Sequence, residues 1–316
     1  KDSKKGPAWS NSLFEDNAEF GYGMLLAQQA IRDGLKAKVE EVAANENATA
    51  EVKAACQEWL DTFGVGATNG AATDKLVAAL ENVDCPTCKD IVKNKDFLAK
   101  KSQWIFGGDG WAYDIGFNGV DHVLASGKDI NIMVFNTEVY SNTGGQSSKA
   151  TPTGAVAQFA AGGKEVKQKD LAAIAMSYGY VYVAQISMGA DMNQTIKAIA
   201  EAEAYPGPSL IIAYAPCINH GIKKGMAKAQ TEEKLAVQSG YWNLFRFNPA
   251  AEGKKFSLDC KPATVDYQEF IKGEVRYTSL ALKNPARAEK LFAKAEQNAK
   301  DKYAYLEKLV TLYDEK

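Results

Sequence analysis

Residues 103–111, QWIFGGDGW, decide the fold of this chain. The short apolar run Gln103–Phe106 predicts a strand, which ends in the glycine-rich turn 107–110. Residues 112–125 have the composition of a helix, and Ile130–Phe135 predicts a second, buried strand. A strand followed by a glycine turn, a helix and another strand predicts a right-handed crossover between parallel strands.

The same alternation continues downstream. Helices are predicted at Lys169–Tyr178 and Asp191–Ala204, and strands at Tyr180–Ile186 and Ser209–Tyr214. Strands alternating with helices favour an α/β fold with a mostly parallel, doubly wound sheet covered on both faces.

The flanking regions have a different character. Helical spacing of apolar residues predicts helices at Phe20–Val42, Ala50–Phe63 and Ala71–Leu80, with residues 64–73 as a small-residue loop. The end of the chain is polar after Pro249 and predicts a helix from Pro285 to about Tyr313. We therefore expect an N-terminal and helical segment (1–100), an α/β core (101–250) and a C-terminal tail with a helix (251–316).

Two polar segments follow the first two predicted strands. Asp109 follows the first strand and Thr137 follows the second, 28 residues later, which is about the length of one crossover. If these strands are neighbours, a carboxylate and a hydroxyl meet at one sheet edge, where α/β folds bind ligands. Glycines let the backbone approach an anion, but Asp109 would repel a bare phosphate. A bridging magnesium ion resolves that conflict.

Composition excludes several classes of protein. A net charge of -2 and a pI near 5.9 provide no basic field for nucleic acid. The longest strongly apolar stretch, Leu210–Ala215, is too short to span a membrane. Five irregularly spaced cysteines favour a reducing, cytoplasmic location over a secreted disulfide framework. Because only two histidines are present, acid–base chemistry is expected from carboxylates or a cofactor, and a first residue other than Met suggests a processed chain or a fragment.

The longer motifs resemble a known family. Gly-Asp-Gly with a polar pair about 27 residues later is similar to the thiamine-diphosphate motif, although Thr137 replaces its second Asn. The wider sequence resembles single-chain pyruvate:ferredoxin (or flavodoxin) oxidoreductases over most of residues 6–250, except about 35–95. The matching motifs are GGDGWAYDIG (107–116), TEVYSNTGGQ (137–146), GPAW (6–9), NSLFED (11–16) and YGYVYVA (178–184).

The resemblance implies a site, residue by residue. Asp109, the Thr137 hydroxyl and the Val139 carbonyl would hold magnesium, and Asn142 would act at the reacting carbon. Cys217 would be one ligand of a 4Fe-4S cluster whose other cysteines lie outside this chain. The residues that would surround thiamine diphosphate are Gly108, Asp109, Gly110, Trp111, Thr137, Glu138, Val139, Tyr140, Ser141 and Asn142.

The resemblance also implies a reaction and partners. Pyruvate would be oxidatively decarboxylated to acetyl-CoA and carbon dioxide, with electrons passed through clusters to ferredoxin or flavodoxin. We expect a homodimer that needs the remaining domains, because the residues that hold pyruvate and activate the cofactor have no match here. The arginines, including Arg276, fall in no recognised motif, and His220 has no identifiable partner.

Several alternatives stay open. The chain could come from a non-oxidative thiamine-diphosphate decarboxylase or synthase, from an enzyme for another 2-oxoacid, or from a non-catalytic docking subunit. Cys85 and Cys88 have the spacing of a metal or redox pair, but no second such pair exists, so an incidental pair at a helix start is favoured.

Overall fold

The computed structural model describes residues 14–314. Within them, residues 20–103 form one compact unit, and residues 14–19 together with 104–314 form a second. The motif at 6–9, and the start of the motif at 11–16, lie outside the described residues. The division into segments 1–100, 101–250 and 251–316 remains an expectation.

The first unit is helical. Its core is formed by apolar side chains on one face of each helix, and Trp59, Leu76 and Ile91 are fully buried there. Thr49 caps the second helix by accepting a hydrogen bond from the Val52 amide. The helices are α1 (Asn17–Ala44, which starts in the second unit), α2 (Ala50–Asp61), α3 (Gly66–Leu80) and α4 (Pro86–Lys93), with a 3-10 turn at Lys95–Phe97.

The predicted loop over residues 64–73 is wrong, because α3 already begins at Gly66. The alanines of this stretch are strong helix formers, and Ala72 packs in the core. Asn69, which reads as a turn residue in the sequence, is fully buried and accepts hydrogen bonds from Arg32 (3.1 Å) and from the Lys100 amide (2.6 Å). Tertiary partners therefore stabilise the helix against the local turn preference.

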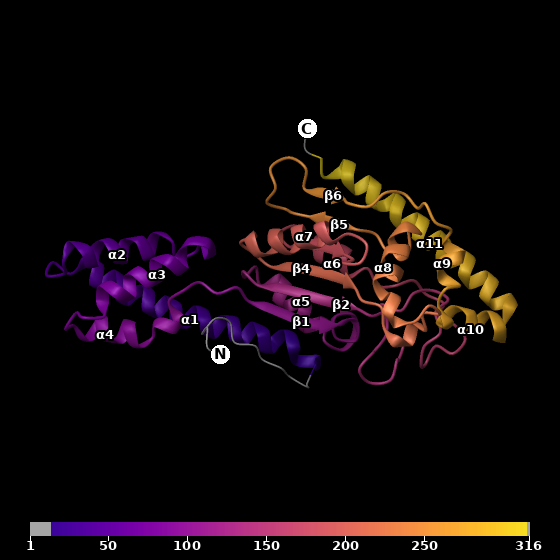
Figure 1. The fold of residues 1–316 in the computed structure, drawn as a ribbon, viewed down its shortest axis with the longest axis horizontal. Helices are drawn as coiled ribbons and strands as arrows, with labels where there is room; N and C mark the ends of the chain where they lie inside the picture. The colour runs from indigo at the N-terminus through magenta and orange to yellow at the C-terminus, as the bar shows by residue number, and fades with distance from the viewer. Residues whose placement is uncertain (1–13, 315–316) are drawn as a thin grey trace. The chain divides into compact units, whose positions relative to one another are not determined.

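The second unit is built on a six-stranded sheet with the order β1-β2-β4-β3-β5-β6 (Figure 1). The first four strands are parallel, and the last two are antiparallel additions. This confirms the α/β class with a mostly parallel sheet. The strands are β1 (Trp104–Gly108), β2 (Asn131–Asn136), β3 (Tyr182–Ile186), β4 (Ser209–Tyr214), β5 (Phe245–Phe247) and β6 (Phe256–Leu258).

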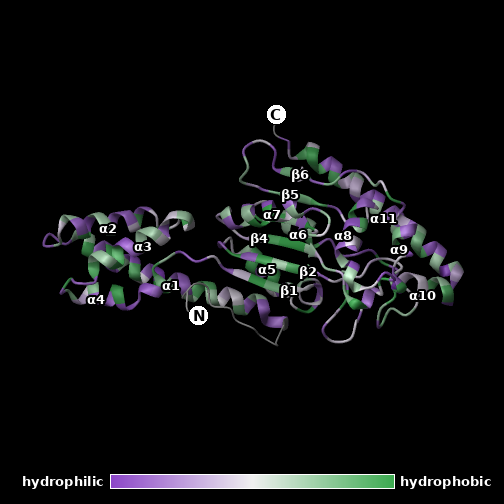
Figure 2. Cartoon of the chain, in the orientation of Figure 1, coloured by the Kyte–Doolittle hydropathy of each residue, from purple (hydrophilic) through white to green (hydrophobic). Residues whose placement is uncertain are grey.

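Both faces of the central strands are buried, as expected for a parallel sheet covered by helices. In β3, Tyr182 and Ala184 on one face and Val183 on the other are all 0% exposed. Alanines of α7 pack against the first of these faces. Hydropathy colouring shows the apolar character of the strands in the middle of the sheet (Figure 2).

Helices and short helical turns cover and extend the sheet. Asp191 and Asn284 cap α7 and α11, and Pro285 takes the first position of α11. The helices are α5 (Phe117–Ala125), α6 (Leu171–Met176), α7 (Met192–Ala204), α8 (Ala229–Gln238), α9 (Tyr267–Ile271), α10 (Val275–Lys283) and α11 (Pro285–Leu312). In the described range 14–314, no helix is long and apolar enough to cross a membrane.

The helix predicted at 112–125 is corrected by the structure. A wide, π-type turn spans Gly110–Ile115, and the regular helix α5 starts only at Phe117. The break lies at Gly116, where an added Cβ would be 2.2 Å from the Trp111 ring. The bulky indole therefore occupies the space beside Gly116 and separates the two helical segments.

Candidate functional site

The ends of β1 and β2 bring the two predicted metal-binding segments together. The strands pair in parallel, with Gly108 opposite Phe135, so Asp109 and Thr137 leave the sheet side by side. The Thr137 hydroxyl donates to Asp109 Oδ1 at 2.8 Å, and the Thr137 amide donates to the same oxygen at 3.0 Å. The Val139 carbonyl lies 3.0 Å from the Thr137 hydroxyl. A carboxylate, a hydroxyl and a carbonyl therefore converge.

The Asp109 carboxylate is buried in a way that suits a cation. It is 0% exposed, and its other oxygen accepts a hydrogen bond from the Ser148 hydroxyl at 2.6 Å. Within the described part of the chain, its hydrogen bonds come from hydroxyl and amide groups and not from a cationic side chain. Burial raises the pKa of Asp109 to about 6, although the hydrogen bonds from Ser148 and Thr137 act to lower it. Oxygen donors around such a buried carboxylate fit a hard divalent cation.

Glycines shape the backbone beside Asp109. A Cβ on Gly107 would be 2.3 Å from the Trp111 ring, and one on Gly110 would be 2.5 Å from the Tyr140 ring. Gly108 is exposed, with only the Phe135 carbonyl within 4.0 Å of an added Cβ. The backbone at Gly108 is thus open to a ligand, while aromatic rings fill the space at Gly107 and Gly110.

The loop after β2 makes a compact turn. The Gly145 amide donates to the Tyr140 carbonyl at 2.8 Å, and the Tyr140 amide donates to the Gln146 carbonyl at 2.9 Å. Asn142 lies at the exposed tip of this turn, next to the half-buried Ser141. The loop therefore holds Asn142 in solvent, beyond the residues that converge on Asp109.

Glu138 has a different environment from its neighbours. Its carboxylate is fully buried and faces Arg276 Nη2 at 2.7 Å. The Tyr241 hydroxyl and the Gln168 side-chain amide also donate to it, at 2.6 Å and 3.0 Å. Its side chain therefore lies inside the protein, although the residue is part of the predicted cofactor loop.

Cys217 lies three residues beyond β4, the neighbour of β2 in the sheet. Its side chain is 9% exposed, and the Asn219 side-chain amide donates to its sulfur at 3.4 Å. The next turn carries His220, whose ring Nε2 lies 2.8 Å from the Thr137 carbonyl. The Cys217 loop and the Thr137 loop therefore meet at one sheet edge.

Comparison with known proteins identifies the family. The model for "Thiamine pyrophosphate enzyme, C-terminal TPP binding domain" matches residues 92–213, which include Asp109 and Thr137. Pyruvate-flavodoxin oxidoreductases of Klebsiella pneumoniae and Enterobacter agglomerans are 52% and 54% identical over 96% and 97% of the chain. Pyruvate:ferredoxin oxidoreductase of Moorella thermoacetica is 54% identical over 96%.

The chain belongs to the pyruvate:ferredoxin and pyruvate:flavodoxin oxidoreductase family. It carries the thiamine-diphosphate-binding part of that family. It spans about a quarter of the length of these relatives, 26% for the Klebsiella protein and 27% for the other two.

The cysteines Cys85 and Cys88, which have the spacing of a metal or redox pair, belong to the helical first unit. Cys85 precedes α4, and Cys88 is buried in the helical core, where burial raises the pKa of its thiol to about 12. All five cysteines are free. Among residues 14–314, no group of three or more His, Cys, Asp or Glu side chains is arranged to hold a metal ion. A complete cluster site is thus absent from that range.

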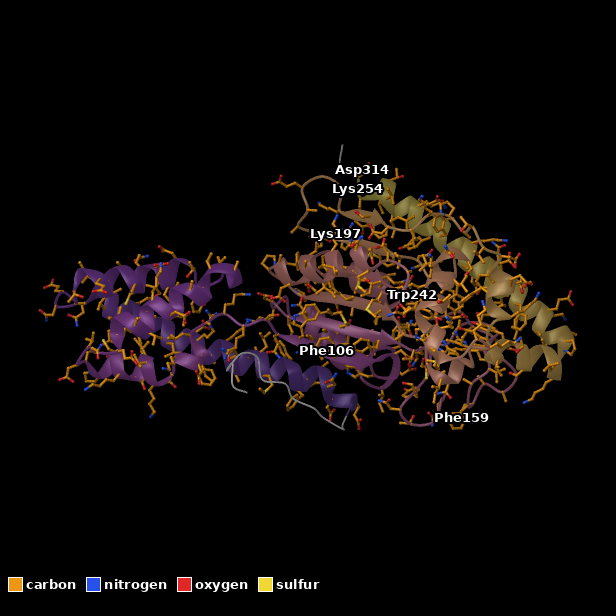
Figure 3. All side chains as sticks on the ribbon, viewed as in Figure 1. Phe106, Phe159, Lys197, Trp242, Lys254 and Asp314 are labelled. Atoms are coloured by element: carbon orange, nitrogen blue, oxygen red, sulfur yellow. The ribbon has the colours of Figure 1, made fainter. Side chains whose placement is uncertain are left out.

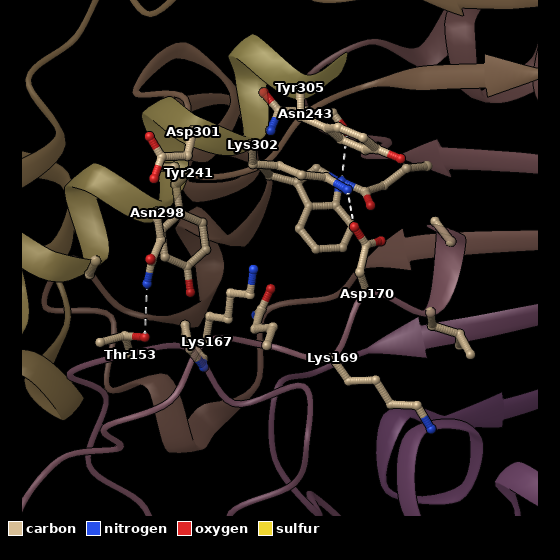
Figure 4. Close-up of a pocket in the computed structure, with 18 of the residues that line it drawn as sticks. Thr153, Lys167, Lys169, Asp170, Tyr241, Asn243, Asn298, Asp301, Lys302 and Tyr305 are labelled. Carbon is tan, nitrogen blue, oxygen red and sulfur yellow. Dashed lines mark hydrogen bonds and ion pairs between the residues drawn. The ribbon is translucent and has the colours of Figure 1, made fainter. Parts of the chain in front are cut away.

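A cavity of about 440 Å³ is lined by Gln168 and Tyr241, the two residues that donate hydrogen bonds to the Glu138 carboxylate. Lys302 and Asp170 form an ion pair on the cavity wall, and the Asn298 side-chain amide of α11 donates a hydrogen bond to the Thr153 hydroxyl (Figure 4). The cavity is separate from the proposed metal ligands, because none of Asp109, Thr137 and Val139 lines it.

Sequence reasoning missed the residues around Glu138. Arg276, Glu274 and Tyr241 come from the region after β4, where no motif marks them. For His220 a hydrogen-bonded structural role was expected, with a partner that the sequence did not identify. No local signal marks Arg276 as buried, because an arginine in a mixed polar and apolar helix such as α10 (VRYTSLALK) is usually exposed.

Proposed function

We propose that this chain is the thiamine-diphosphate- and magnesium-binding part of an enzyme that oxidatively decarboxylates pyruvate to acetyl-CoA and carbon dioxide. Electrons would pass through iron–sulfur clusters to ferredoxin or flavodoxin. One observation carries the proposal: Asp109, the Thr137 hydroxyl and the Val139 carbonyl converge at the ends of two paired strands. The family relationship favours this oxidative reaction over a non-oxidative decarboxylase or synthase and over a docking subunit.

In this proposal three oxygens of the chain hold magnesium: Asp109 Oδ1, Thr137 Oγ1 and the Val139 carbonyl. The exposed backbone at Gly108 leaves room for the diphosphate, which completes the metal's ligands. Thiamine diphosphate, when bound, supplies the nucleophilic carbon and the electron sink that decarboxylation needs. The protein orients it and excludes water. The remaining predicted cofactor contacts (Gly110, Trp111, Glu138, Tyr140 and Ser141) belong to this proposal as well.

Two residues of the chain are assigned further roles. Asn142, at the tip of the loop, contacts the substrate at the reacting end of the cofactor. Cys217 is one ligand of a 4Fe-4S cluster, and its position on the loop beside Thr137 supports this assignment. Because four ligands are needed, the other three cysteines come from the remaining domains.

The wider setting is proposed from the same relationship. Coenzyme A accepts the acetyl group, and two copies of the complete protein form a homodimer in the cytoplasm. The free cysteines are consistent with a reducing compartment.

Calorimetric titration of the protein with thiamine diphosphate, with and without magnesium, tests the proposal. We expect binding that requires magnesium and is lost in Asp109→Asn. Asp121→Asn is the matched control, because this carboxylate lies on α5 and accepts a hydrogen bond from the Tyr178 hydroxyl, away from the proposed ligands. Equal binding by wild type, Asp109→Asn and Asp121→Asn would refute the metal assignment.

A further inference from the structure

Glu138 has an unusual backbone conformation between two proposed metal ligands. Its φ is 60°, and the only other non-glycine residue of the described chain with a positive φ is Phe159. Phe159 is 93% exposed on a loop (Figure 3), whereas Glu138 is 0% exposed. Side chains other than glycine rarely adopt this conformation, because Cβ crowds the backbone. Something in the surrounding structure must therefore hold Glu138 in it.

The conformation of Glu138 determines where its neighbours point. The Thr137 hydroxyl points to Asp109 Oδ1, and the same hydroxyl lies 3.0 Å from the Val139 carbonyl. The left-handed residue between them turns the chain, so that the side chain before it and the carbonyl after it meet on one side. An extended Glu138 would not bring these two oxygens together.

We propose that Arg276 is a positioning residue that clamps Glu138 in this conformation and thereby arranges the metal-binding oxygens. The proposal rests on the proposed magnesium and thiamine-diphosphate site. Arg276 Nη2 lies 2.7 Å from Glu138 Oε2, and Arg276 Nε lies 2.6 Å from Glu274 Oε2. The guanidinium thus bridges two carboxylates in directions that a lysine ammonium cannot reproduce.

The contacts return to the same loop from the other side. Glu274 Oε1 lies 3.5 Å from His220 Nδ1, and His220 Nε2 lies 2.8 Å from the Thr137 carbonyl. The ring of contacts runs from Glu138 through Arg276, Glu274 and His220 to Thr137. Arg276 contacts the Glu138 side chain, and His220 contacts the Thr137 carbonyl. The peptide that joins Thr137 to Glu138 is therefore held from both sides.

The electrostatics keep the clamp charged. Burial acts to lower the pKa of Arg276, but Glu274, Tyr241 and Glu138 together outweigh it and raise the pKa well above its usual value. Burial acts to raise the pKa of Glu274, but Arg276 and His220 together outweigh it and lower the pKa. Such buried ion pairs contribute little net stability, because desolvation offsets their attraction. A positioning role accounts for a buried charged ring beside the proposed ligands better than a contribution to stability does.

Arg276→Lys tests the clamp, with Arg246→Lys as the matched control. Arg246 also bridges two carboxylates of the same unit, Glu201 at 2.6 Å and Asp259 at 2.8 Å, but contacts neither loop of the site. The first readout is hydrogen exchange of the peptide 136–140 in cofactor-free protein. We expect exchange at least about tenfold faster in Arg276→Lys, and unchanged in Arg246→Lys. Unchanged exchange in Arg276→Lys would overturn the proposal.

The second readout is the magnesium-dependent affinity for thiamine diphosphate of Glu138→Gly and Glu138→Ala. Both variants lose the carboxylate, but only glycine adopts a positive φ without strain. If the backbone conformation matters, Glu138→Ala should bind about tenfold more weakly than Glu138→Gly, as follows from the strain on alanine. Equal affinities would mean that the backbone conformation of residue 138 does not affect cofactor binding, and would overturn the clamp. This pair also serves if Arg276→Lys does not fold.

The two proposals fail separately. If wild type does not bind thiamine diphosphate with magnesium, the proposed function is refuted, while the exchange of residues 136–140 still decides whether Arg276 positions the loop. If wild type binds and Arg276→Lys neither exchanges faster nor binds more weakly, the function stands and the clamp is refuted.

Discussion

Replacing Asp109 with Asn should make the cofactor-free protein more stable while it weakens cofactor binding. Asp109 is 0% exposed, and burial raises its pKa to about 6 from the ordinary 3.8. The folded state therefore disfavours the ionised carboxylate. At about 1.36 kcal/mol per pKa unit, this difference corresponds to a penalty of about 3 kcal/mol at neutral pH. Asparagine keeps the shape and an oxygen acceptor for the Thr137 hydroxyl and amide, and it removes the charge.

The pH dependence follows from the direction of the shift. The folded pKa of Asp109 is higher than the unfolded pKa, so the folded state binds more protons between pH 4 and 6. Wild-type stability should therefore fall relative to Asp109→Asn as the pH rises through this window, and the difference should be constant above about pH 7. Urea unfolding of both proteins at pH 4.5, 6 and 7.5, in the absence of magnesium and cofactor, measures it.

Cofactor should narrow the difference in stability between the two proteins. Binding stabilises the folded protein by about 2.7 kcal/mol at a ligand concentration of 100 times Kd. Because Asp109→Asn loses a charged magnesium ligand, we expect its affinity for thiamine diphosphate to fall at least tenfold, about 1.4 kcal/mol. The variant should then gain much less stability from magnesium and thiamine diphosphate. A variant that is less stable than wild type at pH 7.5 without ligand, or that gains as much from cofactor, would refute the reasoning.

Four further outcomes are expected. In the complete enzyme, Asn142→Ala should lower turnover strongly and leave cofactor affinity nearly intact, because Asn142 lies beyond the metal-binding oxygens; equal losses in both would make it a structural residue. The 316 residues alone, prepared anaerobically, should show neither cluster absorbance nor pyruvate-dependent reduction of a viologen dye. Steady dye reduction by the chain alone would contradict this prediction. In the complete protein, Cys217→Ser should remove the cluster absorbance. Burial lowers the pKa of Lys169 to about 8. The stability of wild type relative to Lys169→Met, measured by urea unfolding, should therefore rise between pH 8 and 10.5. A stability difference that does not change with pH would place the ammonium in solvent.

Much of the fold was predictable because its signals are local. Strand β4 is a continuous apolar run with polar flanks, and its observed bounds, Ser209–Tyr214, are those predicted. The helix at the end of the chain is marked by Asn284 and Pro285 at its start, and it was also predicted closely. The length between Asp109 and Thr137 fits one parallel crossover, so the two were predicted to meet if the two strands are neighbours, and β1 and β2 do pair.

The short antiparallel strands β5 and β6 and the helices α9 and α10 were not predicted. Residues after Pro249 look polar in the sequence, yet Phe256 of β6 is 0% exposed. Phe245 and Phe247 of β5, just before Pro249, are at most 2% exposed. A three-residue strand is too short to show a period of two, so its pairing with β3 depends on tertiary packing. Similarly, α3 forms through partners of Asn69 that are distant in sequence.

The sequence by itself therefore determined the strand–helix alternation, the glycine turn after β1 and the two residues that approach each other at the sheet edge. Only the tertiary structure decided what surrounds them. Glu138 and Arg276 are 138 residues apart, and their 2.7 Å contact exists because α10 packs beside the loop after β2. No local pattern encodes such a contact: one buried arginine has no periodicity, and its partner is chosen by the packing of elements that the sequence shows only one at a time.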